Sequence, residues 1–457
     1  MRKILSVLFF IFAALSAPAQ SQKTNIILIL ADDLGLTDLG CYGSSFYETP
    51  NLDKLAASGM RFTNAYSACT VCSPTRAALM TGKSPARLHL TDWIAGQNMP
   101  YAKLQVPDWT MFLPLDETTL AEVLKTQGYA TGAMGKWHLG RDKKYGPEHQ
   151  GFDVYVEGQN AKERTDPNAG GKDTKELTDA ALNFITEKKS SPFFVYLPYY
   201  AVHTPLQARQ TDIDYFKAKK ATGEQRNPTY AGMIKELDEN VGRVIVHLKK
   251  LNLEKNTLVI FTSDNGGLIG ARNTEKQITS NLPYRAGKGG PYEGGVRIPA
   301  IFSWPGKIKP GTTSEEPIIS MDLFNTLAAV AGATDVKTYD GANFLPVLTG
   351  APYQKPLHAQ LYWHYPHYHR GGSTMYSAVL EGNKRLVYHY ETGQKEYYDL
   401  STDISEQKDL YATHPKDAEA LYRKLQTWLT QSNAQLPSPN PTYDEAKKNV
   451  QAKGKED

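Results

Sequence analysis

The stretch NIILILADD, residues 25–33, decides the fold. Residues 25–30 form a continuous apolar run, which is typical of a parallel strand that is buried on both faces. The run leads directly into two carboxylates, Asp32 and Asp33. In an open parallel sheet, ligands bind at the carboxyl ends of the strands. The stretch therefore predicts a buried parallel strand that carries two acidic side chains into a binding site.

Helix and strand patterns alternate downstream of this strand. Thr119 and Glu122 form a capping box ahead of an apolar helix, and Gly128 supplies the stop signal. Further patterns predict a strand at 129–134, a helix at 174–189, a strand at 193–197, a helix at 230–248 and a strand at 257–262. This alternation predicts an α/β fold in which helices flank a large, mixed but mostly parallel sheet.

The pattern changes near Asp340, and short aromatic-rich runs separated by turns follow beyond His358. These runs predict antiparallel strands near 361, 377–380, 386–390 and 396–400, followed by a helix at 415–429. The polar tail after Ser438 is expected to be loose. We therefore predict a large N-terminal domain over residues 20–345 and a smaller C-terminal α+β subdomain over residues 346–457, built on an antiparallel sheet.

The N-terminus has the features of an export signal. Arg2 and Lys3 precede an apolar run at 4–15, which is too short to span a bilayer as a mature helix. The run ends in an A-x-A cleavage pattern at 17–19. Residues 1–19 are therefore expected to be a signal peptide, and the protein to be secreted, into the bacterial periplasm. No later stretch has the length and apolarity of a membrane span.

The charge balance argues against nucleic acid as a partner. The 457 residues include 51 basic and 48 acidic side chains, giving a formal net charge of +3, so no broad basic field exists. The chain is 40% hydrophobic, which is typical of a globular protein with a sizeable core. Any site for an anion must therefore be built locally.

A second acidic pair supports a metal site. Asp264 and Asn265 follow the predicted strand at 257–262, as Asp32 and Asp33 follow the first strand. Either pair alone would be read as an ordinary turn or helix cap. Together, at two strand ends of one sheet, they offer the hard oxygen ligands that suit calcium or magnesium.

Cationic side chains follow other strand ends. Lys136 and His138 come after the strand at 129–134, and both would point the same way if the segment is extended. His203 follows the strand at 193–197, and Lys288 lies in a glycine-rich loop. Acidic metal ligands combined with several cations predict a site for an anionic ester. At this point a phosphate and a sulfate ester fit equally well.

The candidate nucleophile is Cys72. The chain has only three cysteines, so a disulfide framework is excluded, and the C-x-x-C spacing of Cys69 and Cys72 has no partner pair for zinc and no thioredoxin-like context. Ser73 and Pro74 are typical helix-start residues, which places Cys72 at a helix N-terminus that favours anions. Arg76 projects from the first turn of that helix.

The segment 72–82, CSPTRAALMTG, resembles the C-x-P-x-R signature of type I sulfatases, and 135–140, GKWHLG, resembles their second signature. The resemblance runs from about residue 25 into the C-terminal region. Within the family, the chain resembles secreted bacterial carbohydrate sulfatases. It implies the alkaline-phosphatase-like fold. It also implies that a maturation enzyme oxidises Cys72 to formylglycine (3-oxoalanine), whose hydrate attacks sulfur with one hydroxyl and expels sulfate with the other.

The resemblance also implies residue roles. Ca²⁺, or Mg²⁺, would be held by Asp32, Asp33, Asp264, Asn265 and modified Cys72, and Asp264 could also accept the diol proton. Arg76 and Lys136 would hold the hydrate and neutralise sulfate charge. His138 would take the second hydroxyl's proton. His203 and Lys288 would bind sulfate and protonate the leaving oxygen, and which of the two is the acid stays open.

Sulfated glycans are the expected substrates, with exo action on sulfated galactose or N-acetylgalactosamine. The sugar-facing candidates lie in an LTDW segment at 90–93 and an aromatic run at 363–370, and they are Asp92, Trp93, His364, His367 and Arg370. The aromatic run fits a domain interface equally well. Two other functions are open: a formylglycine-type phosphonate or phosphate ester hydrolase of the same superfamily, and a non-catalytic glycan-binding protein.

Overall fold

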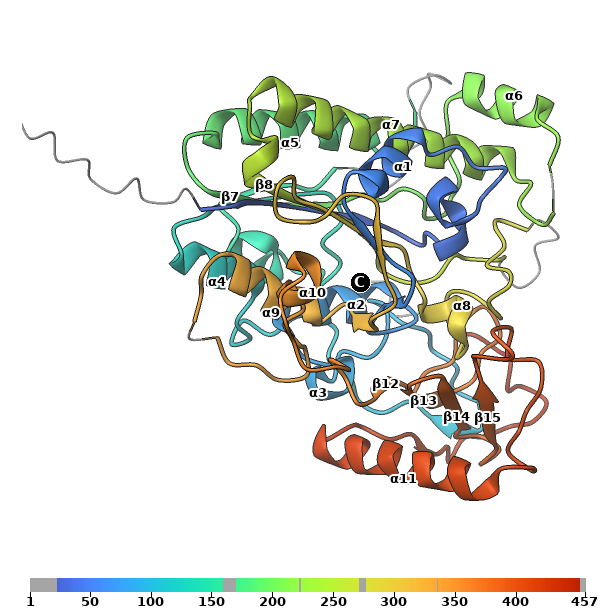
Figure 1. Ribbon diagram of the computed structural model, residues 1–457. Coiled ribbons are helices and arrows are strands. Elements are labelled where there is room, and N and C mark those ends of the chain that lie inside the picture. The colour runs from blue at the N-terminus through green and yellow to red at the C-terminus, as the bar shows by residue number, and fades with distance from the viewer. Residues whose placement is uncertain (1–22, 159–169, 222, 271–276, 335, 453–457) are drawn as a thin grey trace, which may run out of the picture.

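One mixed, eight-stranded sheet forms the centre of the protein (Figure 1). The computed structural model describes residues 23–158, 170–221, 223–270, 277–334 and 336–452, so the predicted signal peptide at 1–19 lies outside the described residues. The strand order is β10-β2-β9-β8-β1-β7-β5-β6. In that order the strands are Thr312–Ser314, Met60–Phe62, Ala300–Ser303, Thr257–Ser263, Asn25–Ala31, Phe193–Pro198, Ala130–Met134 and Val154–Val156.

The five strands β8, β1, β7, β5 and β6 are all parallel, as the apolar runs predict. Only β9 runs antiparallel to its neighbours, β8 and β2. Every residue of β1 is buried. In the register of β1 and β8, Ala31 pairs with Ser263. The acidic pairs that follow the two strands therefore leave the sheet side by side.

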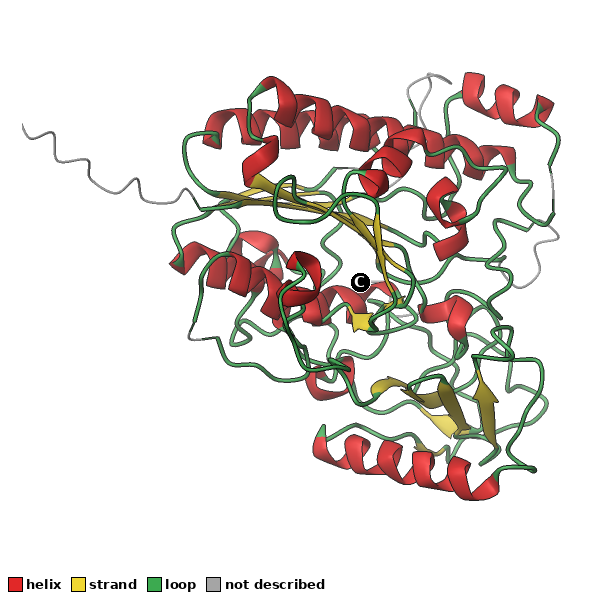
Figure 2. Ribbon diagram, in the orientation of Figure 1, coloured by secondary structure: helices red, strands yellow, loops and turns green. Residues whose placement is uncertain are grey.

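Helices cover both faces of the sheet (Figure 2). On one face lie α1 (Pro50–Ala57), α5 (Thr174–Lys188) and α7 (Pro228–Lys250), with α6 (Gln210–Ala218) against α7. On the other face lie α2 (Cys72–Thr81), α4 (Leu120–Thr126) and α9 (Asp322–Val330). Alternate residues of β1 enter the two cores: Ile27 and Ile29 pack beneath α5 and α7, and Leu28 packs beneath α2 and α4. The predicted α/β layering is confirmed.

Local signals place the helix ends. The Thr119 side chain accepts from the Glu122 N–H and the Glu122 carboxylate accepts from the Thr119 N–H, so the capping box of α4 is present. Gly82 ends α2 with φ 68°, a left-handed conformation that favours glycine. The shorter elements are β3 (Ala65–Tyr66), α3 (Pro85–Leu88), α8 (Glu293–Val296), β11 (Ile318–Ile319) and α10 (Leu345–Thr349).

The C-terminal part is a four-stranded antiparallel sheet with one long helix against it (Figure 1). Its strands are β12 (Leu361–Tyr365), β13 (Tyr376–Glu381), β14 (Lys384–His389) and β15 (Lys395–Asp399), and its helix is α11 (Pro415–Gln431). One face packs against α11 through Val379 and Leu386. The opposite face packs on the N-terminal domain through Trp363, whose indole N–H donates to the Ser67 carbonyl at 2.8 Å. The predicted α+β subdomain is confirmed.

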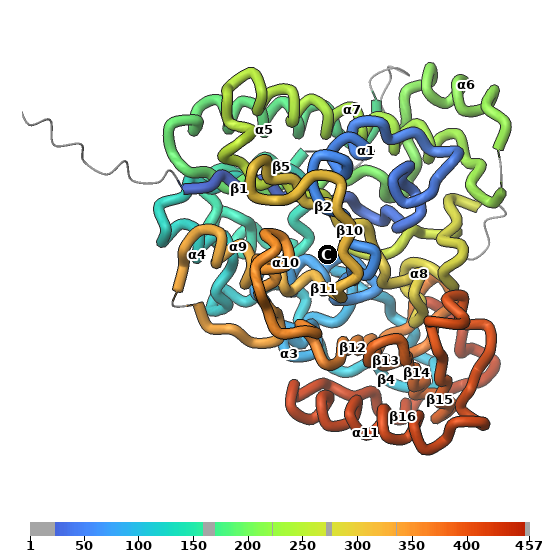
Figure 3. Tube along the Cα trace, viewed as in Figure 1, coloured from blue at the N-terminus to red at the C-terminus, as the bar shows by residue number. Residues whose placement is uncertain are grey.

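The prediction of a loose tail after Ser438 is wrong for the described part of it. β16 (Ser438–Pro439) pairs antiparallel with β4 (Leu104–Gln105), and Figure 3 labels both strands in the C-terminal part. The Asn440 side chain donates to the Pro100 and Ala102 carbonyls at 2.9 and 2.7 Å. Backbone pairing with a distant segment holds the tail, and polar composition gives no sign of such pairing. Within the described residues, no helix is long and apolar enough to cross a bilayer.

Candidate active site

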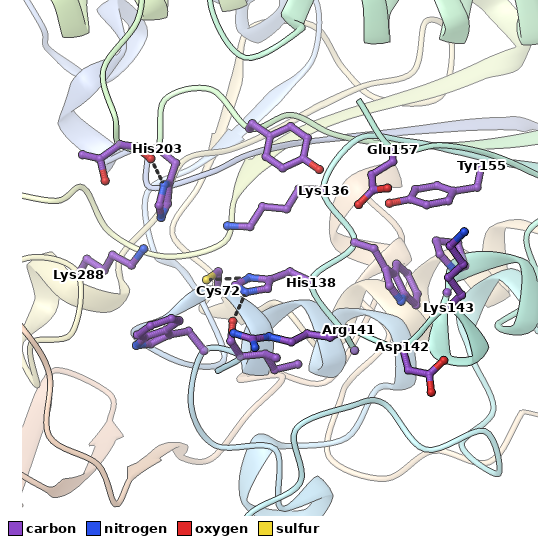
Figure 4. A pocket seen from close by; sticks show the side chains of 18 of the residues that line it. Cys72, Lys136, His138, Arg141, Asp142, Lys143, Tyr155, Glu157, His203 and Lys288 are labelled. Atoms are coloured by element: carbon purple, nitrogen blue, oxygen red, sulfur yellow. Dashed lines mark hydrogen bonds between the residues drawn. The ribbon is translucent and has the colours of Figure 1, made fainter. Parts of the chain in front are cut away.

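The carboxyl ends of β1, β8, β5 and β7 meet the N-terminus of α2 at a cavity of about 1130 Å³ (Figure 4). Cys72 lies in this cavity with Lys136 and His138 from the loop after β5, His203 after β7, and Lys288. Asp32, Asp33, Asp264 and Asn265 are buried beside it. The structure therefore brings together all ten residues that the sequence places in the metal and sulfate sites.

The acidic side chains form one buried cluster. Possible ligand atoms of Asp32, Cys72 and Asp264 all lie within 4.8 Å of one another, and so do those of Asp32, Asp33 and His203. Asp32 Oδ1 and Asn265 Oδ1 are buried without a hydrogen-bond donor among the described residues. Such oxygens are costly to bury unless something positive meets them. The donor set of three carboxylates and an amide fits Ca²⁺ or Mg²⁺.

Three cations balance this cluster. Lys136 Nζ is 2.5 Å from Asp32 Oδ2, and Lys288 Nζ is 2.7 Å from Asp33 Oδ1. Arg76 donates from Nε and Nη2 to Asp264 Oδ2, at 3.0 and 2.7 Å. Burial alone would raise the pKa of Asp32, but the charges of Lys136, Arg76 and Lys288 hold it well below its usual range. Asp32 is therefore ionised in the folded protein.

The loop after β5 reaches the site through a close approach of backbone. An added Cβ on Gly135 would lie 2.0 Å from the Pro198 carbonyl oxygen, so only glycine fits there. The next residue, Lys136, donates its N–H to that same carbonyl at 2.8 Å. His138 has φ 58°, so the segment is not extended as the sequence argument assumed. Both side chains nevertheless enter the cavity (Figure 4).

Cys72 is the first residue of α2 and faces His138. Its Sγ lies 3.3 Å from His138 Nδ1, and His138 Nε2 lies 2.6 Å from the Ile94 carbonyl oxygen. Because a carbonyl only accepts, Nε2 carries the proton and Nδ1 presents its lone pair to Cys72. Burial, reinforced by Lys136, lowers the pKa of His138 well below its usual value, which keeps the ring neutral. His138 is thus a proton acceptor aimed at residue 72.

The unmodified thiol is a poor nucleophile in this environment. Burial raises the pKa of Cys72 above its usual value, although Lys136 and Lys288 act in the opposite direction. Since the thiolate is the reactive form of cysteine, a raised pKa works against direct attack by sulfur. The site is arranged for anion chemistry at position 72, but a thiol is badly suited to perform it.

His203 and Lys288 lie on the same side of the cavity (Figure 4). His203 Nε2 is 3.6 Å from Asp33 Oδ2, and its Nδ1 donates to the Thr204 carbonyl at 2.6 Å. Burial and the Lys288 charge lower the pKa of His203 to about 4. Burial opposes the charge of Lys288, but Asp33 outweighs it and raises the pKa of that ammonium. A neutral imidazole, whose Nε2 presents a lone pair, and a charged ammonium donor therefore face the same space.

The sugar-facing candidates separate into two groups. Trp93 and Arg370 line the cavity, whereas Asp92, His364 and His367 are buried outside it. Each member of the buried group has hydrogen bonds within the protein: Asp92 Oδ1 to Tyr365 Oη at 2.8 Å, His367 Nε2 to Thr91 Oγ1 at 2.8 Å, and His364 to Ser377 Oγ at 2.8 Å and to the Gln435 carbonyl at 2.9 Å. Asp92 Oδ2 is buried without a hydrogen-bond donor among the described residues. The prediction that these three contact sugar is corrected, because Asp92 and His367 lie at the contact between the two parts of the chain and His364 is bound inside the C-terminal part.

Sequence reasoning missed several residues that line the cavity. Tyr155 and Glu157 stand at the end of β6, a three-residue edge strand without an apolar run to reveal it. Arg141 follows the GKWHLG segment directly, and its side chain enters the cavity beside His138 (Figure 4). Tyr200 also lines the cavity after β7. Only the position of Arg141 next to a recognised motif could have drawn attention to it.

A sulfatase family model matches residues 24–333, and a model described as the N-sulphoglucosamine sulphohydrolase C-terminal region matches residues 288–435. The chain belongs to the sulfatase family. The matched regions contain every metal and sulfate-site residue described above, and they cover both structural parts of the chain. The enzyme is thus a sulfuric ester hydrolase, as its signatures predict.

Relatives of known identity agree with this assignment. This sulfatase is 30% identical to a sulfatase of Formosa agariphila, over 95% of each chain. It is 34% identical to the N-acetylgalactosamine-6-sulfatase of Homo sapiens over 402 residues, 81% of this chain and 72% of that protein. The crystal structure of Ps i-CgsB in complex with k-i-k-neocarrahexaose is 31% identical, covers 92% of this chain and 95% of its own, and superposes with a TM-score of 0.73. The predicted fold is therefore confirmed.

Proposed function

We propose that this sulfatase removes sulfate from a sulfated carbohydrate, acting from a chain end on sulfated galactose or N-acetylgalactosamine. The observation that carries the proposal is the placement of Cys72 at the start of α2, beside the acidic cluster and within reach of the charges of Lys136 and Lys288. The carbohydrate assignment is supported by relatives whose names include an N-acetylgalactosamine-6-sulfatase and a protein solved with a neocarrahexaose.

In the proposed mechanism, a maturation enzyme oxidises Cys72 to formylglycine, whose hydrate supplies one hydroxyl to attack sulfur and a second whose deprotonation releases sulfate. Arg76 and Lys136 hold that side chain and offset charge that develops on the sulfate oxygens. His138 Nδ1, which faces residue 72 at 3.3 Å in the unmodified protein, accepts the second hydroxyl's proton. Lys288, or His203 when Nε2 carries a proton, donates to the leaving oxygen, and which of the two does so stays open.

Asp32, Asp33, Asp264 and Asn265, with an oxygen of modified residue 72, would hold a calcium ion, with magnesium as the alternative. When bound, the ion supplies positive charge next to the reacting oxygens. Asp264 lies in the same cluster and is proposed to take the proton of the attacking hydroxyl. Burial and Asp32 raise the pKa of Asp264 to about 6 against the opposing charge of Arg76, which suits a carboxylate that gains and loses a proton.

The proposal is tested by kinetics on a matched panel. Purified enzyme from a host that contains the maturation enzyme should hydrolyse N-acetylgalactosamine 6-sulfate and galactose 6-sulfate, and it should release sulfate only from the terminal residue of an oligosaccharide. Aryl sulfate and aryl phosphate serve as the comparison pair. Faster hydrolysis of phosphate or phosphonate esters would reassign the enzyme to that hydrolase class. Glycan binding without turnover by formylglycine-containing protein would identify a binding protein instead.

Removal of the metal is expected to lower the thermal midpoint as well as the activity. A ligand that binds only the folded state stabilises it by RT ln(1 + [L]/Kd), about 2.7 kcal/mol when its concentration is 100 times Kd. Chelation by EDTA should therefore lower Tm, and added calcium should restore it. Asp33→Ala should lose the calcium-dependent shift, whereas Asp340→Ala, an acidic residue paired with Arg87 outside the site, should keep it. Equal shifts in both variants would contradict the metal assignment.

We also propose that the enzyme is exported to the periplasm after removal of residues 1–19. The support is the order of features in those residues: two basic residues, then an apolar run, then an A-x-A cleavage pattern. N-terminal sequencing of protein recovered from the periplasmic fraction should give Gln20 as the first residue.

A further inference from the structure

Arg370 lines the cavity, but its positive charge is not used by the proposed mechanism. Among the described residues its guanidinium forms no ion pair; its neighbours are the ring of Trp93, 5.3 Å from Cζ to the ring centroid, and the side-chain amide of Gln97. By contrast, Lys136 and Lys288 in the same cavity are each paired with a carboxylate. A cation at the cavity wall without an acidic partner is available to an anionic ligand.

The guanidinium is held in place by its neighbours. With the Gln97 amide oxygen turned toward it, that oxygen accepts from the Arg370 backbone N–H and from Nε, both at 3.1 Å. The Trp93 ring supports the guanidinium through a cation–π contact. Both contacts fix the arginine through Nε and its planar face, which leaves the two Nη groups for a ligand. A fixed arginine loses less side-chain freedom on binding than a free one.

Arg370 is placed next to the reacting centre by two segments. On one side is Trp93, whose neighbour Ile94 contacts His138 through its carbonyl oxygen at 2.6 Å. On the other side is His369, whose ring lies so close to Gly289 that an added Cβ there would be 2.0 Å from Nδ1. Gly289 follows Lys288 directly. Arg370 therefore lies on the Lys288 side of the cavity. Its neighbour in sequence, His369, packs on Gly289, which follows Lys288.

The other end of the cavity carries side chains of both charges. Glu157 and Tyr155 lie across Cys72 from Lys288 (Figure 4). Arg141 and Lys143 line that same end, so the Glu157 carboxylate does not make it acidic overall (Figure 4). Among the described residues, Arg370 differs from Arg141 and Lys143 in being held by Gln97 and Trp93, on the Lys288 side of the cavity.

We propose that Arg370 binds a second anionic group of the substrate, in addition to the sulfate that is removed. This inference rests on the proposed sulfatase function and narrows its substrate to glycans that carry two negative groups, one beside the scissile ester. The group is an oxyanion, either a second sulfate or a uronate carboxylate, since the arginine fork matches both.

The kinetic test compares three saccharides with the mature enzyme. These are N-acetylgalactosamine 6-sulfate, its 4,6-disulfate, and a disaccharide that joins a uronate to N-acetylgalactosamine 6-sulfate. The wild type should prefer at least one doubly charged substrate over the first by about tenfold in kcat/KM, because hydrogen bonds to charged groups are the strong ones. R370A should bring the ratio of kcat/KM for the doubly charged substrate to that for the monosulfated sugar down to about one, and R370K should retain part of the preference. R423A, an exposed arginine on α11, should leave the ratio unchanged.

A binding test separates this inference from the proposed function. Titration calorimetry on C72A protein measures affinity without turnover. Adding R370A to that variant should lower the affinity for the doubly charged ligand about tenfold and change the affinity for the monosulfated ligand little. Comparing the 4,6-disulfate with the uronate disaccharide shows whether Arg370 binds a sulfate or a carboxylate. Equal affinity for all three saccharides, or an equal loss for all three in R370A, would overturn the role of Arg370. Charge-selective binding by C72A, combined with no hydrolysis of these saccharides by the mature enzyme, would support the role of Arg370 and overturn the proposed sulfatase substrate.

Discussion

Replacing Cys72 with alanine should abolish sulfate release, with a loss in kcat/KM of at least about 10³-fold, the scale seen when a covalent nucleophile is removed. The reason is that the surrounding groups have nothing to act on: His138 Nδ1 faces this side chain at 3.3 Å, and Lys136 and Lys288 exert their charges on it. The measurement is kcat/KM on the sulfated sugars, together with the mass of the tryptic peptide 62–76. Active wild-type enzyme should give the mass of formylglycine at position 72.

Cys69 provides a matched control in the same peptide. It is buried three residues earlier, and its recorded hydrogen bonds run through its backbone, with its N–H donating to Thr75 Oγ1 and its carbonyl accepting from Ser67 and Thr75. Cys69→Ala keeps these bonds and should remain active. Turnover by Cys72→Ala at the wild-type rate, or a fully active enzyme whose peptide retains both thiols, would refute the formylglycine mechanism.

The sequence revealed those parts of the fold in which one local signal dominates. The strand at 25–31 is apolar at nearly every position because helices cover both faces of the sheet, and α4 begins where its capping box predicts. The tail after residue 438 behaved differently. Its backbone pairs with residues 104–105, more than three hundred positions away, and a polar sequence carries no trace of such a partner. Long-range pairing of weak segments is thus what local patterns cannot predict.

The candidate site shows the same difference between local sequence signals and long-range packing. Residues at strand ends, such as Asp32 and Asp264, could be brought together because parallel strands share one edge. The aromatic run at 363–370 could not be resolved from sequence, because residues of the same run have opposite fates. His364 and His367 are buried with protein partners, whereas Arg370 lines the cavity. Which of them meets a ligand depends on where β12 packs, and that is a property of the tertiary structure.

Arg76 connects the stability of the fold to the function of the site. Its side chain is wholly buried, donates twice to Asp264 Oδ2, and lies 3.7 Å from Asp32. It also donates to the Lys136 carbonyl at 2.6 Å, so it fixes the loop that carries His138. Removing one partner of a buried ion pair leaves the other charge uncompensated and costs about 3–5 kcal/mol. Arg76→Ala should therefore lose stability and activity together.

The measurement is urea unfolding of wild type and Arg76→Ala in the presence of EDTA, so that no bound cation substitutes for the guanidinium. We expect the free energy of unfolding to fall by about 3–5 kcal/mol, and Arg76→Lys to recover part of it because charge returns without the paired donors. The control is Arg226→Ala, whose exposed pair with Glu224 should cost less than about 1 kcal/mol. If Arg76→Ala cost no more than this control, Asp264 would have to find another counter-charge in the folded protein, and the balance of three cations against three carboxylates would be wrong.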